Sequence, residues 1–383
     1  MTLAQTASIL QAPPQIQFDG WRETERREFY RRYELSFPSP YDTPYPRNNI
    51  VKLSITMPTD SPGPVPVVIL LHYWGASSAT VEDVLSRNLA ERGVASVLMP
   101  LPYHLTRTPP GTLSGELAVQ ADPEALRKTM TQSVQDVRRT IDWIATRPEF
   151  DSTKVGVNGT SLGAMVAALA FAVDSRISAS CYVLGGADLA HILWNSSRVV
   201  SQRERLRKLG YTEARMREEL KEVEPLNYLD PSDSRPSFVI AARYDTVIPP
   251  VDSEKLIAAL GNSQELWLNT GHYGGVLVGP KISRTVARYF QTTFNGQKFV
   301  APTVFYSPTI RFGLHTNDET GVQVIAGLDV WRLRAAGKTF ASVLVTPKGV
   351  LGYIGHTVSR ELSIGITITR RRTTWGVLWS VVL

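Results

Sequence analysis

The stretch Lys154-Val-Gly-Val-Asn-Gly-Thr-Ser-Leu-Gly-Ala-Met-Val-Ala-Ala-Leu-Ala-Phe-Ala-Val173 decides the fold of this chain. A short apolar strand, 154–158, leads directly into Gly159-Thr-Ser161-Leu-Gly163, and an apolar helix follows over 164–173. The G-x-S-x-G pattern alone is weak evidence, because it arises by chance in about one chain in ten of this length. Between a buried strand and a helix it gains weight, since that turn exposes a nucleophilic serine beside the positive end of a helix dipole. The alternative is a serine that only caps the helix.

The sequence on either side of this stretch alternates between strand and helix patterns. We expect strands at 50–57, 65–71, 95–100, 154–158, 177–184, 237–242 and 264–269, and helices at 79–92, 123–147, 164–173, 253–260 and 281–294. Several of the strands are continuous apolar runs, which indicates that helices cover both faces of the sheet. The predicted fold class is therefore α/β, with a doubly wound and mostly parallel sheet.

Changes in composition and hydrophobic pattern divide the chain into three parts. Residues 1–47 read as an N-terminal arm, in which the charged stretch 22–32 is expected to form a short helix. Residues 48–295 form the α/β domain, and a polar segment at 189–223 is too long for a loop, so it is predicted to be a helical cap inserted above the sheet.

Residues 296–383 form the third part and read as a small all-β region of about six strands, either a sheet or a partial barrel. Its expected strands lie within 309–314, 321–331, 340–345, 350–354, 362–369 and 375–383. Three roles are open for it: a surface for homodimer formation, a contact with a membrane or cell envelope, or a stabilising cover. The run Arg370-Arg371-Arg372 between two apolar strands motivates the membrane contact.

Composition excludes several classes of protein. The 296–383 region holds ten Lys/Arg and four Asp/Glu, so it accounts for the whole formal net charge of +6 and leaves the rest neutral. These charges are scattered, which argues against nucleic acid as a partner. The lone Cys181 is expected to be inert core. No signal peptide or membrane-spanning helix is recognisable, so the expected location is the cytoplasm.

On these motifs, residues 50–294 resemble the α/β-hydrolase superfamily, nearest to its esterase and dienelactone-hydrolase-like branches. The resemblance implies that the loop Leu71-His-Tyr-Trp-Gly75, after the first buried strand, supplies part of an oxyanion hole. Its backbone donors would be the amides of Trp74 and Leu162. His72 in the same loop is expected to support the loop rather than to act as the base.

The resemblance also implies a triad in the chain order serine, acid, histidine. Asp245 follows a strand at its carboxyl end, in Arg243-Tyr-Asp245-Thr-Val-Ile-Pro, and is the expected acid, although a turn-forming aspartate would fit this sequence as well. Of six histidines, His272 directly follows a strand, in a glycine-rich loop that suits a catalytic base. The predicted triad is therefore Ser161, Asp245 and His272.

The predicted activity is that of a serine esterase, a carboxylic ester hydrolase that works through an acyl-enzyme on a small-molecule ester and needs no metal or organic cofactor. An aminopeptidase-like or thioester hydrolase is the alternative, because triad chemistry does not choose between these bonds. A non-catalytic binding protein with the same fold is a further alternative. Four aromatic residues are expected to contact substrate: Tyr73, Tyr103, Trp194 and Tyr273.

Overall fold

The chain divides into two structural units. The computed structural model describes residues 8–59, 61–303, 305, 307–332, 338–359, 361–370 and 372–382. The first unit comprises Met1–Ala241, Val247–Leu266 and Gly279–Pro302, and the second comprises Ala242–Thr246, Trp267–Val278 and Thr303–Leu383. The second unit therefore joins the C-terminal region to two short loops that interrupt the first. The sequence-based boundaries at 47/48 and 295/296 stay a prediction.

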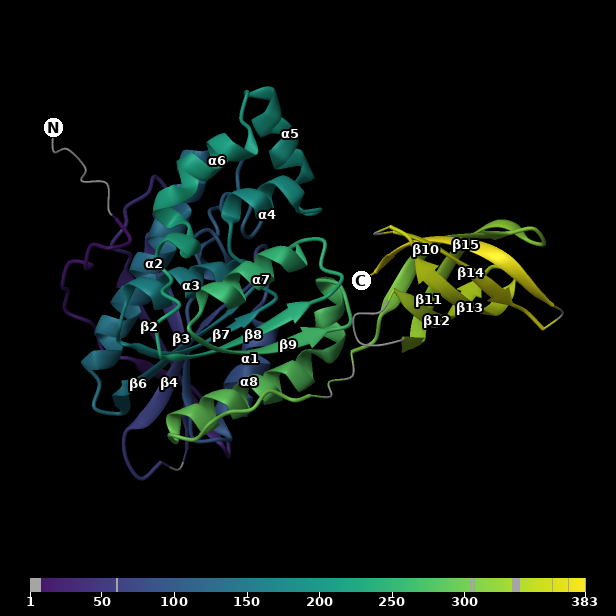
Figure 1. Cartoon of the computed structure of the whole chain (residues 1–383). Coiled ribbons are helices and arrows are strands. Elements are labelled where there is room, and N and C mark those ends of the chain that lie inside the picture. Colours follow the sequence, from purple (N-terminus) through teal and green to yellow (C-terminus); the bar gives the residue numbers. More distant parts are fainter. Residues whose placement is uncertain are drawn as a thin grey trace. The chain divides into compact units, whose positions relative to one another are not determined.

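A nine-stranded sheet forms the centre of the α/β fold (Figure 1). Its spatial order is β1-β2-β3-β5-β4-β6-β7-β8-β9, and the run from β5 to β8 pairs in parallel. The strands are β1 Arg22–Arg26, β2 Tyr30–Pro38, β3 Ile50–Pro58, β4 Val65–Leu71, β5 Ala95–Leu98, β6 Phe150–Thr160, β7 Ile177–Val183, β8 Pro236–Ala242 and β9 Asn262–Leu268. The predicted fold class, a mostly parallel α/β sheet, is confirmed.

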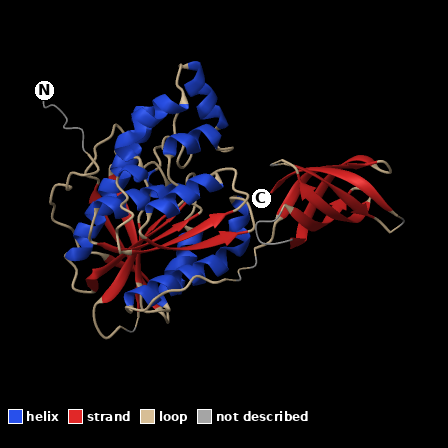
Figure 2. Cartoon of the chain, viewed as in Figure 1, coloured by secondary structure: helices blue, strands red, loops and turns tan. Residues whose placement is uncertain are grey.

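Helices cover both faces of this sheet, as Figure 2 shows. They are α1 Thr80–Ala90, α2 Pro123–Ala145, α3 Leu162–Val173, α7 Pro250–Ala259 and α8 Gly279–Phe294, with short 3₁₀ turns η1 Leu105–Arg107 and η3 Pro225–Asn227. Helix α1 packs against α8, and α2 packs against α3. The central strands are consequently buried on both sides, and Cys181 in β7 is a free, fully buried cysteine, as expected from the sequence.

The prediction of a helix over residues 22–32 was wrong. Strands β1 and β2 form an antiparallel hairpin, and β2 continues the sheet by pairing with β3. The apolar residues of β2 alternate, so that Leu35 and Phe37 are buried while their neighbours face outward. Tyr33 stacks on Trp21 with ring centroids 4.6 Å apart. The charged residues gave no helical apolar stripe, and pairing with β3, distant in sequence, decided the outcome.

Three helices and a 3₁₀ turn occupy residues 189–223, where the sequence predicted a helical cap. They are α4 Leu189–Asn195, α5 Val200–Lys208, α6 Glu213–Leu220 and η2 Lys221–Val223. Helix α6 packs against both α4 and α2. Leu206, Met216 and Leu220 are buried, so the segment has an apolar side of its own despite its many charges.

In the second unit, six antiparallel strands form a closed barrel. They are β10 Ile310–Asn317, β11 Gly321–Arg332, β12 Thr339–Thr346, β13 Gly349–Thr357, β14 Leu362–Ile368 and β15 Thr373–Val382, and the pairing of β10 with β15 closes the ring. The loop 267–278 of this unit contains η4, Tyr273–Val278. The predicted number of about six strands is confirmed, but the expected open sheet or partial barrel is wrong, because β10 pairs with β15 and these two strands are too far apart in the chain for local patterns to show it.

Side chains alternate along the barrel strands with an unusual polarity. Many buried positions are polar, among them Arg311, His315, Ser342, Thr367 and Ser380. The exposed positions are largely apolar: Phe312, Leu314, Val322, Val324, Leu328, Val330, Trp331, Val343, Val345, Val350, Ile354, Ile364, Ile366, Ile368, Trp375, Val377, Trp379 and Val381. Homodimer formation and membrane contact through this region stay predictions, and Arg371 of the predicted arginine run lies outside the described residues.

Among the described helices, none is long and apolar enough to cross a membrane. The expected absence of a signal peptide rests on residues 1–11, most of which lie outside the described residues, because these begin at Ser8.

Candidate active site

Ser161 lies in a strained turn between β6 and α3. Its backbone angles are φ 54° and ψ −113°, a conformation that a non-glycine residue adopts only where the surroundings enforce it. One such constraint is the hydrogen bond from its N–H to the Val183 carbonyl, 2.8 Å long. The turn is so tight that a Cβ at Gly159 would collide with the Gly163 carbonyl, and one at Gly163 with the Leu71 carbonyl. Both glycines of the G-x-S-x-G pattern are therefore required for steric reasons, because no side chain fits at either position.

The loop after β4 contains Trp74, one of the two expected oxyanion donors. Two contacts hold this residue: its indole N–H donates to the Gly115 carbonyl at 2.8 Å, and its own carbonyl accepts from Arg198 Nη2 at 3.0 Å. The other expected donor, Leu162, is the first residue of α3, where backbone N–H groups have no carbonyl partner within the helix. Both positions suit a backbone donor, and their role in an oxyanion hole stays a prediction.

Two buried histidines support the same loop. The Leu101 N–H donates to Nε2 of His72 at 3.0 Å, while Nδ1 of His72 lies 2.9 Å from the Tyr73 carbonyl and so carries the proton. His104 repeats the pattern, with Nε2 accepting from the Gly75 N–H at 3.0 Å. Because each ring uses both nitrogens on backbone groups, neither is arranged as a general base. The sequence had assigned the supporting role to His72 and had not recognised it in His104.

Acidification is expected to weaken this loop support. Burial lowers the pKa of His72 to about 4 and that of His104 to about 3. A histidine kept neutral in the folded state stabilises it fully above the unfolded pKa of about 6.5, and this stability is lost as the pH falls below that value. For each ring the loss at pH 5 is about 2 kcal/mol of unfolding free energy.

The measurement is chemical denaturation of wild type and His104→Gln at pH 7 and pH 5. Burial also raises the pKa of Glu82 to about 7, which acts in the opposite direction over the same range, so the difference between the two proteins is the quantity to follow. We expect the variant to have a lower free energy of unfolding than wild type at pH 7. This difference between the two proteins should be smaller by about 2 kcal/mol at pH 5. A difference in unfolding free energy that does not depend on pH would contradict the conclusion that His104 is neutral in the folded protein.

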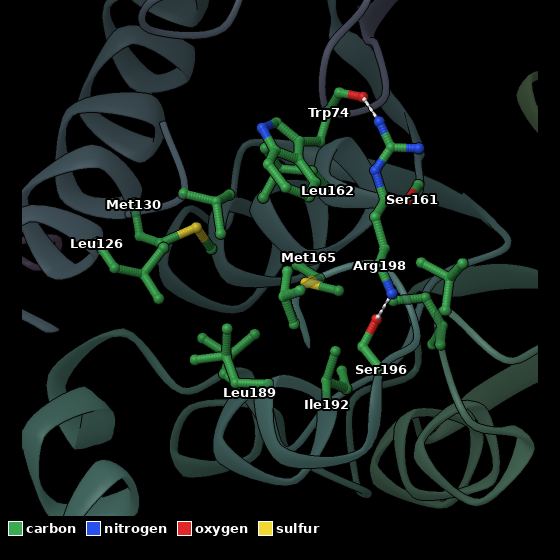
Figure 3. Close-up of a pocket in the computed structure, with 15 residues that line it drawn as sticks. Trp74, Leu126, Met130, Ser161, Leu162, Met165, Leu189, Ile192, Ser196 and Arg198 are labelled. Carbon is green, nitrogen blue, oxygen red and sulfur yellow. Dashed lines mark hydrogen bonds between the residues drawn. The ribbon is translucent and has the colours of Figure 1, made fainter. Parts of the chain in front are cut away.

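Ser161 opens onto an apolar cavity within the first unit, drawn in Figure 3. About 580 Å³ of empty space lies in the cavity and at its mouth, part of it open solvent. Its lining residues are Trp74, Val119, Leu126, Met130, Ser161, Leu162, Met165, Leu189, Ile192, Leu193, Ser196, Arg198, Val199, Val247 and Ile248. Arg198 is the one charged residue among them, and its guanidinium lies 4.8 Å from the centroid of the Trp74 ring. No acidic side chain is among these lining residues.

The four aromatic residues expected to contact substrate are not among the lining residues of this cavity. Tyr103 packs edge-on against Tyr45, with ring centroids 5.9 Å apart, and the ring of Trp194 lies under the Arg207 guanidinium. Tyr73 contributes its backbone carbonyl to His72, and Tyr273 belongs to the second unit. Their role in substrate binding stays a prediction, while the apolar lining from α2 and α4 was not recognised from the sequence.

Asp245 and His272 form a close pair within the second unit. His272 Nδ1 lies 2.7 Å from Asp245 Oδ2, and both side chains are largely buried. This geometry fixes the imidazole with its proton on Nδ1 and leaves Nε2 as the acceptor that a general base requires. The Tyr273 ring meets that of His272 edge-on at 5.6 Å. The structure therefore brings together two of the three predicted triad residues, and Ser161 belongs to the first unit.

A second histidine–aspartate pair lies in the first unit. His191 Nδ1 is 2.8 Å from Asp252 Oδ2, and Lys255 also donates to the Asp252 carboxylate at 3.1 Å. Asp188, which accepts from Lys255 and Arg217, extends this ionic cluster between α4, α6 and α7. The pair ties the segment 189–223 to α7. The sequence gave no sign of it, because the partners are far apart and neither lies in a recognisable motif.

No set of three or more His, Cys, Asp or Glu side chains that could hold a metal ion occurs in the described part of the chain.

Comparison with known proteins gives one family match. Residues 50–224 match the model of the X-Pro dipeptidyl-peptidase (S15) family. No curated protein sequence matches this chain.

Solved structures resemble the chain at low sequence identity. An acetyl xylan esterase from Paenibacillus sp. R4 superposes with a TM-score of 0.56 and 16% identity, covering 71% of this chain and 88% of that one. The acylaminoacyl peptidase of Pyrococcus horikoshii gives a TM-score of 0.53 at 14% identity, covering 73% of this chain and 44% of that one. At these identities the likeness shows the fold alone.

These observations define the fold of the chain. A mostly parallel sheet, a serine on a strained strand-to-helix turn and the likeness to these solved structures show that the chain has an α/β-hydrolase fold. Together with the peptidase family match, they support a hydrolase of the esterase or peptidase kind.

Proposed function

We propose that this protein is a serine hydrolase that cleaves carboxylic esters with an apolar acyl group. The observation that carries the proposal is Ser161 on its strained turn at the wall of an apolar cavity. Twelve of the fifteen lining residues are apolar, the exceptions being Ser161, Ser196 and Arg198, so the cavity suits a hydrocarbon chain or ring bound beside the nucleophile.

In this proposal Ser161 attacks the ester carbonyl carbon while His272 takes the hydroxyl proton. Asp245 keeps the imidazole in the tautomer that can accept that proton and stabilises the imidazolium. The amides of Trp74 and Leu162 donate to the oxyanion of the tetrahedral intermediate, each worth roughly 3–4 kcal/mol in comparable sites. The protonated His272 then gives its proton to the departing alcohol, and water hydrolyses the acyl-enzyme by the same steps.

The cavity lining favours an ester over a dipeptide substrate. A dipeptidyl-peptidase must accept a free ammonium group at the amino end of its substrate, and a buried ammonium requires a carboxylate partner. The described lining residues include no Asp or Glu, and the charged side chain among them is the cationic Arg198. An aminopeptidase-like activity therefore has less support than ester hydrolysis, although the chain matches a peptidase family. A thioester would meet the same apolar surroundings and stays the alternative.

A substrate panel tests the proposal. Initial rates are measured with p-nitrophenyl butyrate, a butyryl thioester and an alanyl-prolyl p-nitroanilide, each with wild type and with Ser161→Ala as the blank. We expect kcat/KM for the ester to exceed that for the anilide by at least about 100-fold, the discrimination an unpaired buried ammonium would impose. Faster cleavage of the anilide would reject the ester assignment and favour a peptidase.

A further inference from the structure

The second unit joins the C-terminal barrel to the two loops that contain Asp245 and His272. These loops are Ala242–Thr246, after β8, and Trp267–Val278, at the end of β9. The contacts that hold these loops decide how accurately the Asp–His pair is positioned. Several of those contacts come from the barrel.

The first set of contacts fixes Asn269, three residues before His272. The Asn269 N–H donates to Ser307 Oγ at 2.7 Å, and the Asn269 carbonyl accepts from Thr309 Oγ1. Ser307 and Thr309 are both buried, in the segment that enters β10. Both backbone polar groups of one loop residue are therefore held by side chains from the start of the barrel. Such buried hydrogen bonds restrict the loop more than solvent-exposed ones would.

The second set of contacts fixes Tyr244, the residue before Asp245. The guanidinium of Arg332, at the end of β11, lies 4.7 Å from the centroid of the Tyr244 ring. Arg332 is held in turn by Asp329, whose Oδ2 accepts from Arg332 Nη2 at 2.5 Å. Burial raises the pKa of the Tyr244 hydroxyl, in keeping with a ring enclosed between loop and barrel. A guanidinium at this distance from an aromatic ring is attracted to it by a cation–π interaction.

Both sets of contacts meet at Asp329. Its backbone N–H donates to the Thr309 carbonyl at 3.0 Å, and its carboxylate accepts from Arg311 Nε at 2.7 Å as well as from Arg332. Ser342 of β12 donates to the same carboxylate at 2.5 Å. A buried carboxylate with this many donors is held in one position. One rigid cluster in the barrel thus reaches both loops.

We propose that the C-terminal barrel positions the Asp245–His272 pair, with Thr309 and Arg332 as positioning residues. The two loops are also tied to each other, since the Tyr244 N–H donates to the Thr270 carbonyl at 3.1 Å. Displacing either loop therefore changes the alignment of the carboxylate with the imidazole. This inference rests on the proposed function, and it assigns the C-terminal region a part in the chemistry that a stabilising cover would not have.

The test uses full-length Thr309→Val and Arg332→Met, with two matched controls in the same barrel. Thr339→Val removes a hydroxyl that bonds His356, and Lys348→Met removes a cation that donates to the Thr320 carbonyl, neither of which touches the loops. The readouts are kcat and KM on p-nitrophenyl butyrate, the thermal midpoint, and the downfield proton NMR signal of the His272 Nδ1–H. His272→Gln assigns that signal.

We expect each loop-contact variant to lower kcat by about 10- to 100-fold with KM nearly unchanged, because a small misplacement of a catalytic group has effects of this size. The Nδ1–H signal should broaden or move upfield in these two variants and stay in place in both controls. The inference is overturned if the signal and kcat are unchanged, or if they change equally in the controls. Activity that survives Ser161→Ala would reject the proposed function alone, since the NMR signal reports the positioning without turnover.

Discussion

Ser161→Ala is expected to lower kcat for ester hydrolysis by about 10⁴-fold or more, leaving only the catalysis that binding and oxyanion stabilisation supply. The substitution removes one oxygen atom from a residue whose conformation is set by backbone contacts, such as the Val183 carbonyl. Alanine lacks the hydroxyl and keeps the Cβ, so the turn should still form. The measurement is steady-state kinetics on p-nitrophenyl butyrate, with mass spectrometry of the protein after treatment with a fluorophosphonate.

Ser196→Ala is the matched control, because Ser196 lines the same cavity and is also buried. It should keep activity within a few-fold of wild type and still form one adduct. Wild type should gain the adduct mass on the peptide that contains residue 161, and Ser161→Ala should not. An adduct on another serine, or unchanged turnover in Ser161→Ala, would indicate a different nucleophile. Absence of both turnover and adduct in wild type would favour the non-catalytic alternative.

The sequence predicted those parts of the fold that depend on local patterns. The turn at 159–163 needs glycine on both sides of Ser161 for steric reasons. The short buried stretch 155–157 before it and the continuously apolar helix after it can be recognised without any partner. The same holds for β4 and for residues 238–242 of β8, whose burial on both faces produces apolar runs. The order of acid and base along the chain came from the resemblance.

Features that depend on distant partners were missed. Strand β2 is a strand because it pairs with β3, and its charged neighbours misled the local interpretation. The cavity wall combines Met130 of α2 with Ile192 of α4, two positions too far apart in the chain for the sequence to connect. The contacts of Thr309 with Asn269 and of Arg332 with Tyr244 join barrel and loops across 40 or more residues, so no periodicity could reveal them.

Asp245→Asn is the second substitution with a large expected effect, about 10⁴-fold in kcat. The asparagine amide has nearly the shape of the carboxylate, but it can donate a hydrogen bond to Nδ1 and so favour the tautomer with the proton on Nε2. His272 would then present a donor where the proposed mechanism needs an acceptor. Such a loss corresponds to about 5.5 kcal/mol of transition-state stabilisation, far more than one weakened contact in the ground state would give.

The second histidine–aspartate pair provides the control for this prediction. Asp252→Asn makes the same chemical change at the 2.8 Å contact with His191, inside the first unit. It should lower the thermal midpoint, because Lys255 and His191 lose a buried anionic partner, while kcat per folded molecule stays near that of wild type.

The pH dependence of activity separates the two aspartates further. Asp245→Asn should regain part of its activity at alkaline pH, where hydroxide can take the serine proton that His272 in the wrong tautomer cannot accept, and Asp252→Asn should not. If both substitutions lower kcat alike, the acid of the triad is not specific to Asp245, and the assignment made from its place after β8 would have to be given up.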